Sequence, residues 1–302
     1  MAEPSDALPP SAGPERPPSG LTRVSERIRR IVAPNPSPFT FTGTCVYIVG
    51  EGEVAIIDPG PADPAHLDVL LAAISGERVA RIVVTHSHRD HAGGAALLQR
   101  RTGAPIVGAR AHRVADGKPT RADASHALDY APDETLEDGA RLAGRGFTLE
   151  AVATPGHAAN HLCFALAEEN ALFSGDHVMA WSTSVVAPPD GSMRAYLASL
   201  EKVARRSEAI YWPGHGGPVR DPQRYVRALI SHRRQREAAI LARLEAGEAN
   251  VAEIVARVYP SLAPALIGAA SLSTLAHLAD LAERGLAASD GAITLEARFR
   301  RL

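Results

Sequence analysis

The sequence has little cysteine and no excess of charge of one sign. Cys45 and Cys163 are its only cysteines among 302 residues, too few for a disulfide framework or a thiolate zinc site. Any metal would therefore be held by nitrogen and oxygen, which 12 histidines could supply. The chain has 32 Lys and Arg residues and 34 Asp and Glu residues, a net charge of -2. As a whole it therefore lacks the excess of positive charge that is typical of nucleic-acid-binding proteins.

The sequence also lacks long apolar runs. None approaches the roughly 20 residues that cross a bilayer, and the N-terminus has neither the basic start nor the apolar stretch of a signal peptide. We therefore expect a cytoplasmic protein with no membrane partner. Residues 1–20 are rich in Pro, Ser, Gly and Glu and poor in large apolar groups, which predicts a disordered N-terminal tail.

The rest of the chain has the composition of a folded protein, 45% apolar and 22% charged, and its length allows one large or two modest domains. After the tail, β-branched runs alternate with helical segments, which predicts an α/β domain over residues 21–221. Strands are expected at 44–49, 53–57, 81–85, 105–108, 147–153, 161–167, 171–174 and 209–212, and helices at 64–75, 92–101 and 192–205.

Beyond the α/β region the pattern changes to helices. They are expected at 223–246, 251–259 and 272–284, and Asn250 followed by Glu253 resembles a capping box. Asp290-Gly291 then suits a tight hairpin turn. Three helices followed by a hairpin is the order of a winged-helix module, so we predict a small C-terminal domain over residues 222–302.

The strongest motif is THSHRDHAGG at 85–94, which follows an expected strand and opens an expected helix. Four potential metal ligands fall within six positions of this loop, where their side chains can converge on a small volume. Imidazole and carboxylate groups are ligands that suit zinc. Three more glycine-containing turns follow expected strands and add further ligands. The full set is His86, His88, Asp90, His91, His157, Asp176 and His215.

These motifs in this order, HxHxDH with Gly-Gly, then TPGH, SGD and PGH, resemble the metallo-β-lactamase superfamily. The resemblance implies a four-layer αβ/βα sandwich that binds two zinc ions per chain. The first ion would be held by His86, His88 and His157, the second by Asp90, His91 and His215, and Asp176 would bridge them. Two ions turn a shared water into a hydroxide nucleophile, so the expected reaction is hydrolysis. Asp90 is the candidate to orient that water, and Asp58 is a candidate acceptor for a ligand imidazole.

Several branches of the superfamily fit poorly. Asp176 and His215 are too close in sequence to admit the inserted domain of the messenger-RNA-processing nucleases. The Cys-x-Arg of glyoxalase-II-like thioesterases and persulfide dioxygenases is missing after Asp176, and Met179 stands where lactonases carry tyrosine. SGD at 174–176, PGHG at 213–216 and ISHR at 230–233 are similar to the branch of beta-lactamase-like protein 2. That branch implies a phosphodiester substrate, as in single-stranded RNA, or an acyl thioester.

Other functions remain open. Two alternatives share the scaffold: a non-haem iron oxygenase of the persulfide-dioxygenase kind and a glyoxalase-II-like thioesterase. A third is a winged-helix binding protein whose hydrolase domain has lost its activity. The candidate partners are a small-molecule or RNA substrate and a second copy of the chain. Duplex DNA is not expected, because the presumed recognition helix carries little positive charge.

Candidate substrate contacts come from two segments. Thr183 and Ser184 lie just beyond the bridging motif, and Arg233 and Arg236 belong to an arginine-rich helix whose forked donors suit phosphate. The alternative for these arginines is a solvated helix face with interdomain ion pairs. The remaining histidines without motif context are interpreted as surface or packing residues: His66, His112, His126 and His277.

Overall fold

The computed structural model describes residues 15–113 and 121–302. Its described part contains a seven-stranded sheet in the order β1-β2-β3-β4-β5-β6-β7. β3 pairs antiparallel with β2 and β4, whereas β4 to β7 run parallel to one another. The strands are β1 Thr22–Arg23, β2 Ile28–Val32, β3 Cys45–Glu51, β4 Glu53–Ile57, β5 Arg78–Val84, β6 Ile106–Gly108 and β7 Glu134–Thr135.

A second sheet of five strands has the order β12-β11-β10-β9-β8 among the described residues. Its inner face packs on the first sheet through apolar side chains such as Tyr47 from the first sheet and Phe164 and Phe173 from the second. Successive side chains of a strand point to opposite faces of its sheet, which places these residues inward. The strands are β8 Arg141–Gly144, β9 Phe147–Ala153, β10 Leu162–Leu166, β11 Ala171–Gly175 and β12 Ile210–Pro213.

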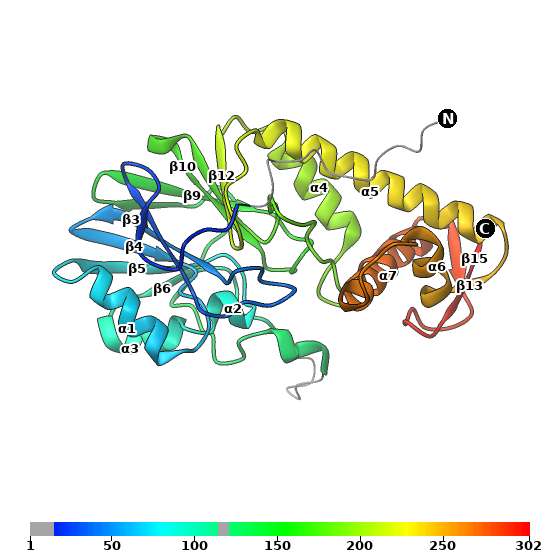
Figure 1. Cartoon of the computed structure of the whole chain (residues 1–302), viewed down its shortest axis with the longest axis horizontal. Coiled ribbons are helices and arrows are strands. Elements are labelled where there is room, and N and C mark those ends of the chain that lie inside the picture. Colours follow the sequence, from blue (N-terminus) through cyan, green and yellow to red (C-terminus); the bar gives the residue numbers. More distant parts are fainter. Residues whose placement is uncertain (1–14, 114–120) are drawn as a thin grey trace.

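Helices cover the outer face of each sheet (Figure 1). α1 Pro64–Ala73 and α3 Ala95–Thr102 pack on the first sheet. α4 Met193–Val203 and the first half of α5 Pro222–Glu245 pack on the second. The predicted four-layer αβ/βα sandwich is confirmed. The helix expected at 92–101 is divided into α2 Arg89–Ala92 and α3, and short 3-10 turns lie at η2 Arg121–Ser125 and η3 Ala167–Glu169.

The C-terminal domain has its own apolar core, which contains Ile240, Ile254, Leu278 and Phe299. The side chain of Asn250 accepts from the Glu253 amide, and Glu253 accepts from the Asn250 amide, so the capping box of α6 is present. The elements are β13 Ala249–Asn250, α6 Val251–Val258, η4 Pro264–Leu266, α7 Ile267–Glu283, β14 Ala287–Ser289 and β15 Arg298–Arg301.

The predicted tight turn at Asp290-Gly291 is wrong. β14 pairs with β15, which begins only at Arg298, so a long loop joins the two strands. Asp290 closes this loop: its amide donates to the Arg298 carbonyl, and its side chain accepts from the Arg298 amide. An Asx side chain that bonds the backbone in this way competes with a two-residue turn.

α5 is one continuous helix that joins the two units. Its first half contributes Val226 and Leu229 to the core of the sandwich, and its second half contributes Ile240 and Leu244 to the C-terminal core. The predicted boundary at residue 222 coincides with the start of this helix, but the change of core lies inside it. Of the predicted tail, residues 1–14 lie outside the described residues. Residues 15–20 have no regular structure, and the Arg16 guanidinium lies 4.6 Å from the Phe41 ring centroid.

The helical segment Pro264–Glu283 is long and apolar enough to cross a membrane by length and composition. In the fold it is a core helix, because Leu275, Leu278 and Leu281 are buried against α5 and α6. Core helices of soluble domains pass the same composition test.

Candidate metal centre

Four of the predicted ligands lie on the loop between β5 and α3. β5 is a central strand parallel to both neighbours, so its carboxyl end opens at one edge of the first sheet. His86 and His91 are fully buried there, and Asp90 is half-buried. The loop turns tightly at Gly93, where a Cβ would lie 2.3 Å from the Arg89 carbonyl oxygen.

The other three ligands follow strands of the second sheet. His157, Asp176 and His215 come after β9, β11 and β12, respectively. β10 runs antiparallel between β9 and β11, and β12 runs parallel to β11, so the three carboxyl ends lie at the same edge. This edge faces the loop after β5, and the seven positions converge between the two sheets.

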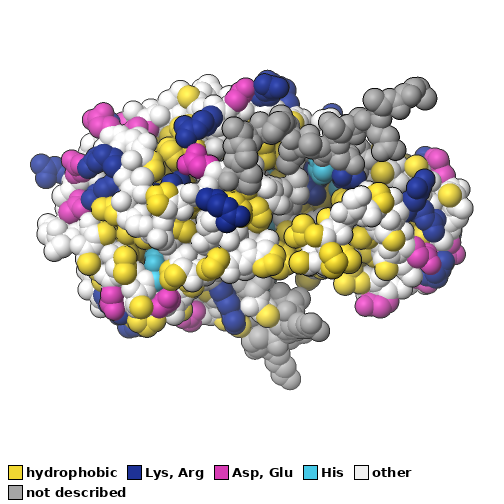
Figure 2. Space-filling model, viewed as in Figure 1, with side chains coloured by type: hydrophobic (Ala, Val, Ile, Leu, Met, Phe, Trp, Pro, Cys, Tyr) yellow, Lys and Arg dark blue, Asp and Glu magenta, His cyan; other side chains and the backbone are white. Residues whose placement is uncertain are grey.

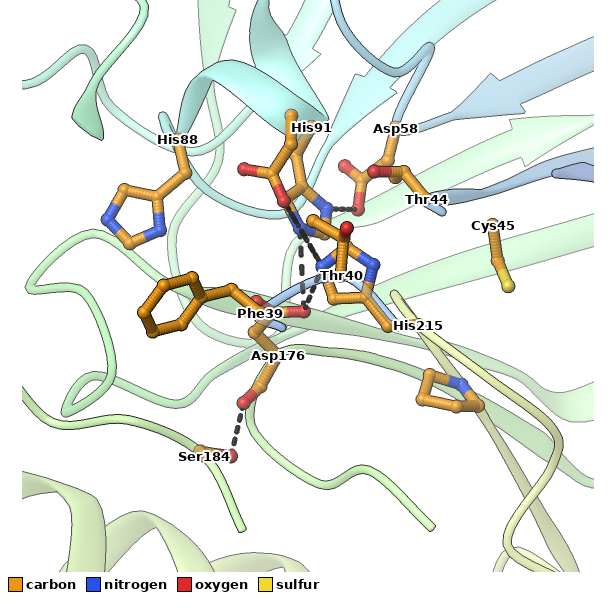
Figure 3. Close-up of polar contacts among 12 residues, drawn as sticks. Phe39, Thr40, Thr44, Cys45, Asp58, His88, His91, Asp176, Ser184 and His215 are labelled. Carbon is orange, nitrogen blue, oxygen red and sulfur yellow. Dashed lines mark hydrogen bonds and ion pairs between the residues drawn. The ribbon is translucent and has the colours of Figure 1, made fainter. Parts of the chain in front are cut away.

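The seven side chains form the two sets that the sequence predicts. Figure 3 shows His88 of the first set, His91 and His215 of the second, and Asp176. In the first set, His88 Nδ1 lies 3.0 Å from His86 Nε2 and 3.1 Å from His157 Nε2. In the second set, His215 Nε2 lies 3.3 Å from His91 Nε2 and 3.1 Å from Asp90 Oδ2.

Asp176 lies between the sets. Its Oδ2 is 3.6 Å from His157 Nε2, and its Oδ1 is 3.4 Å from both His91 Nε2 and His215 Nε2. One carboxylate therefore faces both groups of imidazoles, as expected of a bridging ligand.

The donor set fits metal ions. Ring nitrogens that face one another at about 3 Å need a shared proton or a cation between them, because neutral imidazoles offer lone pairs there. Asp176 Oδ1 is buried and receives no hydrogen bond within the described part of the chain. Gly214 leaves the space open, since a Cβ there would lie 2.7 Å from Asp176 Oδ1. Nitrogen and carboxylate ligands suit zinc and iron alike, so the set indicates two divalent cations without selecting the element.

The electrostatics of the two ligand sets differ. Despite burial, the charges of Asp90 and Asp176 raise the pKa of His91 well above the usual value, and the charge of Asp176 raises that of His215 to about 9. Burial, and then the charges of neighbouring histidines, lower the pKa of His86 and His88 well below the usual value, so both imidazoles are neutral, as ligands must be. Burial alone would raise the pKa of Asp176, but the charges of His215 and His91 outweigh it. Its pKa therefore lies well below the usual range, and the carboxylate stays ionised.

Asp58 makes the contact predicted for it. Its Oδ2 lies 2.9 Å from His91 Nδ1, which leaves His91 Nε2 facing the cluster. The same carboxylate accepts from the Thr85 amide and from the Thr85 hydroxyl, each at 2.8 Å. Such a partner fixes the tautomer and orientation of a ligand imidazole.

Two further histidines were not assigned a role by the sequence. His161 Nε2 accepts from the Asp176 amide at 3.2 Å, and Thr154 holds the other ring nitrogen, so His161 positions the bridging residue. His126, interpreted above as a surface or packing residue, lies beside His88 with ring centroids 4.8 Å apart. Its nearness to the motif loop could not be read from the sequence, because a long connection separates them.

A cavity of about 1180 Å³ opens over the metal-ligand cluster. Asp90, His157 and Asp176 lie at its base. Its walls are largely apolar and come from both domains: Phe39, Met179, Trp181, Pro188, Pro189, Tyr259, Leu262, Leu266, Ala270 and Leu272. Figure 2 shows apolar side chains gathered over the end of α7 that faces the sandwich.

Three of the four predicted substrate contacts line this cavity. Thr183 is half-buried, whereas the Ser184 hydroxyl is committed to the backbone oxygens of Asp176 and His177. Arg233 also lies in the wall. Arg236 is placed elsewhere: its guanidinium stacks over Tyr259 and donates to the Val258 carbonyl, which ties α5 to α6. The prediction of Arg236 as a substrate contact is therefore not retained.

Family models match most of the described fold. The metallo-beta-lactamase superfamily model matches residues 39–215, and the beta-lactamase associated winged helix domain matches residues 251–295. The first covers every predicted metal ligand, and the second covers α6 and α7 of the C-terminal domain.

Several curated proteins are similar in sequence. Lactamase-like protein adaB of Aspergillus niger is 32% identical over 76% of this chain and 68% of its own length. An atrochrysone carboxyl ACP thioesterase of Aspergillus fumigatus is 32% identical over 74% of this chain and 66% of its length. The beta-lactamase-like protein 2 homolog of Caenorhabditis elegans is 31% identical over 73% and 72%. The matched region thus spans about two thirds of these relatives.

Solved structures share the fold. A metallo-beta-lactamase family protein of Thermus thermophilus superposes with a TM-score of 0.76 at 24% identity, over 93% of this chain and 100% of that one. A Burkholderia ambifaria beta-lactamase domain protein gives a TM-score of 0.78 at 20% identity, over 93% and 94%. Together with the converging ligands and the family models, these likenesses show that the chain belongs to the metallo-beta-lactamase superfamily, in the branch that carries a C-terminal winged helix domain.

Proposed function

We propose that this chain is a zinc-dependent hydrolase of acyl thioesters with an apolar acyl group. The observation that carries the proposal is the cavity of about 1180 Å³, which has the metal-ligand cluster at its base and apolar side chains of both domains in its walls. Ligand sites of this kind bury a largely apolar molecule and fix it with a few polar groups. An acyl chain would lie along the apolar walls, with its carbonyl group at the cluster.

The residues at the base have distinct tasks. Two zinc ions, one per ligand set, would polarise the scissile carbonyl and supply an activated water. Asp90 is ionised and faces the cavity, so its carboxylate can orient the attacking water. Asp176 lies between the two ligand sets and connects them. Asp58 fixes the orientation of His91, and His161 fixes that of Asp176. Phe39 and Trp181 contribute apolar surface to the cavity wall.

Single-stranded RNA fits this cavity less well. A groove that binds single strands combines a basic track for the phosphates with exposed aromatic platforms. Here Arg89 and Arg233 are the two arginines among the lining residues, and the residues that η4 and α7 contribute are small or aliphatic and carry no charge. The printed name of the fungal relative, an acyl-carrier thioesterase, supports the same choice.

A substrate screen tests this function. Zinc-loaded protein is assayed on acyl thioesters of increasing chain length, single-stranded RNA, a lactone and a cephalosporin. We expect thioester hydrolysis whose KM falls as the acyl chain lengthens, because each buried CH₂ contributes about 0.8 kcal/mol. Asp176→Asn should reduce turnover at least about 100-fold, while Asp138→Asn, at an exposed ion pair with Lys202, should not.

Two results of the screen would contradict the proposed thioesterase function. Cleavage of RNA without any thioester hydrolysis would replace the proposed substrate class and keep the hydrolase. Metal analysis that finds one iron per active chain, together with oxygen consumption, would favour the oxygenase alternative instead.

A further inference from the structure

Arg233 is a buried cation without a carboxylate partner. Its residue is only 2% exposed, and no Asp or Glu among the described residues forms an ion pair with it. A buried guanidinium is normally paired, because its charge loses water on burial. Arg29, which is 8% exposed, shows the usual solution, since Glu77 accepts two hydrogen bonds from it.

The protein holds Arg233 in a fixed position. Nη2 donates to the carbonyl oxygen of Ser184, and the guanidinium lies over the Tyr196 ring, 5.2 Å from its centroid. Tyr196 is fixed in turn, because its hydroxyl donates to the His177 carbonyl at 3.0 Å. Nε of Arg233 is buried and has no hydrogen-bond partner in the described part of the chain, so part of the donor fork is unused.

Arg233, whose guanidinium has this unpaired donor, is also one of the residues that line the cavity. Arg30 is equally buried and also has orphaned guanidinium nitrogens, but it is not among the residues that line this cavity. Arg233 is linked to the metal centre by two hydrogen bonds, its own to Ser184 and that of the Ser184 hydroxyl to the Asp176 carbonyl. Because Arg233 and Asp176 line the same cavity, one substrate bound in it can lie beside both.

We propose that Arg233 is a specificity-determining residue that binds an oxyanion carried by the substrate. The proposal rests on the thioesterase function proposed above and adds the chemistry of the substrate: an apolar thioester with a carboxylate or phosphate group away from the scissile bond. A guanidinium fork matches both anions through paired N–H donors. The carboxylate would lie on the acyl chain, and the phosphate would lie on a pantetheine arm of the leaving thiol.

Matched substrates distinguish a carboxylate on the acyl chain from a phosphate on the leaving thiol. One acyl group is presented as its N-acetylcysteamine thioester and as its 4'-phosphopantetheine thioester, and the chain end is either a free carboxylate or its methyl ester. For the wild type we expect KM to be at least about tenfold lower for one anionic member than for its neutral counterpart. In Arg233→Gln this preference should vanish, through a rise in KM for the anionic substrate.

Two variants serve as controls. Arg224→Gln removes an exposed arginine from the same helix and should keep the full preference. Arg233→Lys keeps the charge and should retain part of the preference, which a purely structural role of Arg233 would not explain. If Arg233→Gln does not fold, competition in the wild type replaces it: adipate or inorganic phosphate should raise KM for the anionic substrate more than for the neutral one.

The outcomes distinguish this proposal from the thioesterase function. Equal KM values for anionic and neutral thioesters would overturn the role of Arg233 and leave the hydrolase intact. A preference that survives Arg233→Gln but is lost in Arg89→Gln would also overturn it, because Arg89 lines the same cavity. If no thioester is hydrolysed, calorimetry with the corresponding non-hydrolysable thioethers decides: tighter binding of the anionic probe by wild type than by Arg233→Gln supports the oxyanion site, and equal binding refutes it.

Discussion

Gly214 lies beside the metal-ligand cluster, where its lack of a side chain leaves room for the ligands. A Cβ at this position would lie 2.6 Å from His91 Cε1 and 2.7 Å from Asp176 Oδ1. The backbone of Gly214 is held on both sides, since its amide donates to the Gly175 carbonyl and its carbonyl accepts from the Cys45 amide. The residue therefore cannot move away from the ligands, and its lack of a side chain keeps their positions free.

Gly214→Ala should impair metal binding with little loss of fold. The added methyl would displace His91 and Asp176, which belong to the second ligand set and to its bridge. We expect fewer bound ions per chain by atomic emission and at least about 100-fold lower turnover. The control is Gly291→Ala, at a position with open space around it that does not line the cavity. Full metal content in Gly214→Ala would contradict the placement of the centre.

Asp58 acts on the centre through His91. It accepts from the imidazole and from both donors of Thr85, so its loss would free the ring that faces the cluster. For Asp58→Asn we expect a metal affinity lower by about 10- to 100-fold, measured by competition with a chelator. The control is Asp68→Asn, whose side chain is 71% exposed in an ion pair with Arg101. An unchanged affinity in Asp58→Asn would show that the contact is only structural.

At the scale of elements, α7 carries a buried titratable group. His277 lies inside the interface of α7 with α5, near Arg233, Arg236 and Arg284. Burial, and then the positive charges of these arginines and of His232, lower its pKa to about 3. The imidazole is therefore neutral in the folded protein over the whole physiological range.

This burial predicts that acid weakens the docking of α7. The pKa of His277 is lower in the folded than in the unfolded chain, so the unfolded chain binds the extra proton. The contribution of the neutral His277 imidazole to the free energy of unfolding is fully present above about pH 6.5. It is lost progressively as the pH falls toward about 3. Between about pH 7 and about pH 5 the loss amounts to about 2 kcal/mol in the free energy of unfolding.

Urea unfolding of wild type and His277→Gln at these two pH values checks the prediction. The variant lacks the titrating group, so its free energy of unfolding should fall by about 2 kcal/mol less than that of the wild type. Contributions of other groups, including the metal ligands, cancel in this comparison. Parallel losses in both proteins would show that His277 is not the group responsible.

At the scale of the whole molecule, the cavity exists because two domains meet. The sandwich supplies the cluster and the wall around Trp181, and the C-terminal domain supplies Leu262, Leu266 and Ala270. Arg194 on α4 connects the two units, since it pairs with Asp280 and Glu283 of α7. The winged helix domain thus forms part of the cavity over the metal-ligand cluster.

Leu266→Asp should weaken the binding of long acyl chains selectively. Leu266 is 37% exposed, so the change is tolerated by the fold while it places a charge in the apolar wall. We expect KM to rise about tenfold for a long-chain thioester and little for an acetyl thioester. Ile293→Asp, at a comparably exposed position that does not line the cavity, should change neither. The same rise for both chain lengths would argue against an acyl site at this wall.

Much of this molecule follows from local sequence. The alternation of β-branched runs with helical segments predicts an α/β domain, because strand and helix periods bury different patterns of residues. The resemblance to the metallo-β-lactamase superfamily implies its four layers. The seven metal ligands are identifiable because each follows a strand in a short glycine-containing turn, and these turns must lie at the carboxyl ends of their strands. Asn250 and Glu253 indicate a helix start through bonds between near neighbours.

Other features depend on residues that are far apart in the sequence. The prediction of a turn at Asp290-Gly291 is wrong because pairing with β13 and β14, and not the turn residues, sets where β15 begins. Arg233 and Arg236 lie one helical turn apart, yet one lines the cavity and the other stacks on Tyr259. His126 approaches His88, and Asp58 contacts His91, only when separate segments pack together.

The sequence by itself determined the candidate ligand set and the order of the domains, because these depend on motifs and patterns within short stretches of chain. Tertiary structure alone decided that the C-terminal domain forms part of the cavity wall, and that Arg233 lies buried there without a carboxylate partner among the described residues. The physical reason is that burial and charge pairing are properties of the packed chain, which brings together side chains from distant segments and removes water from between them.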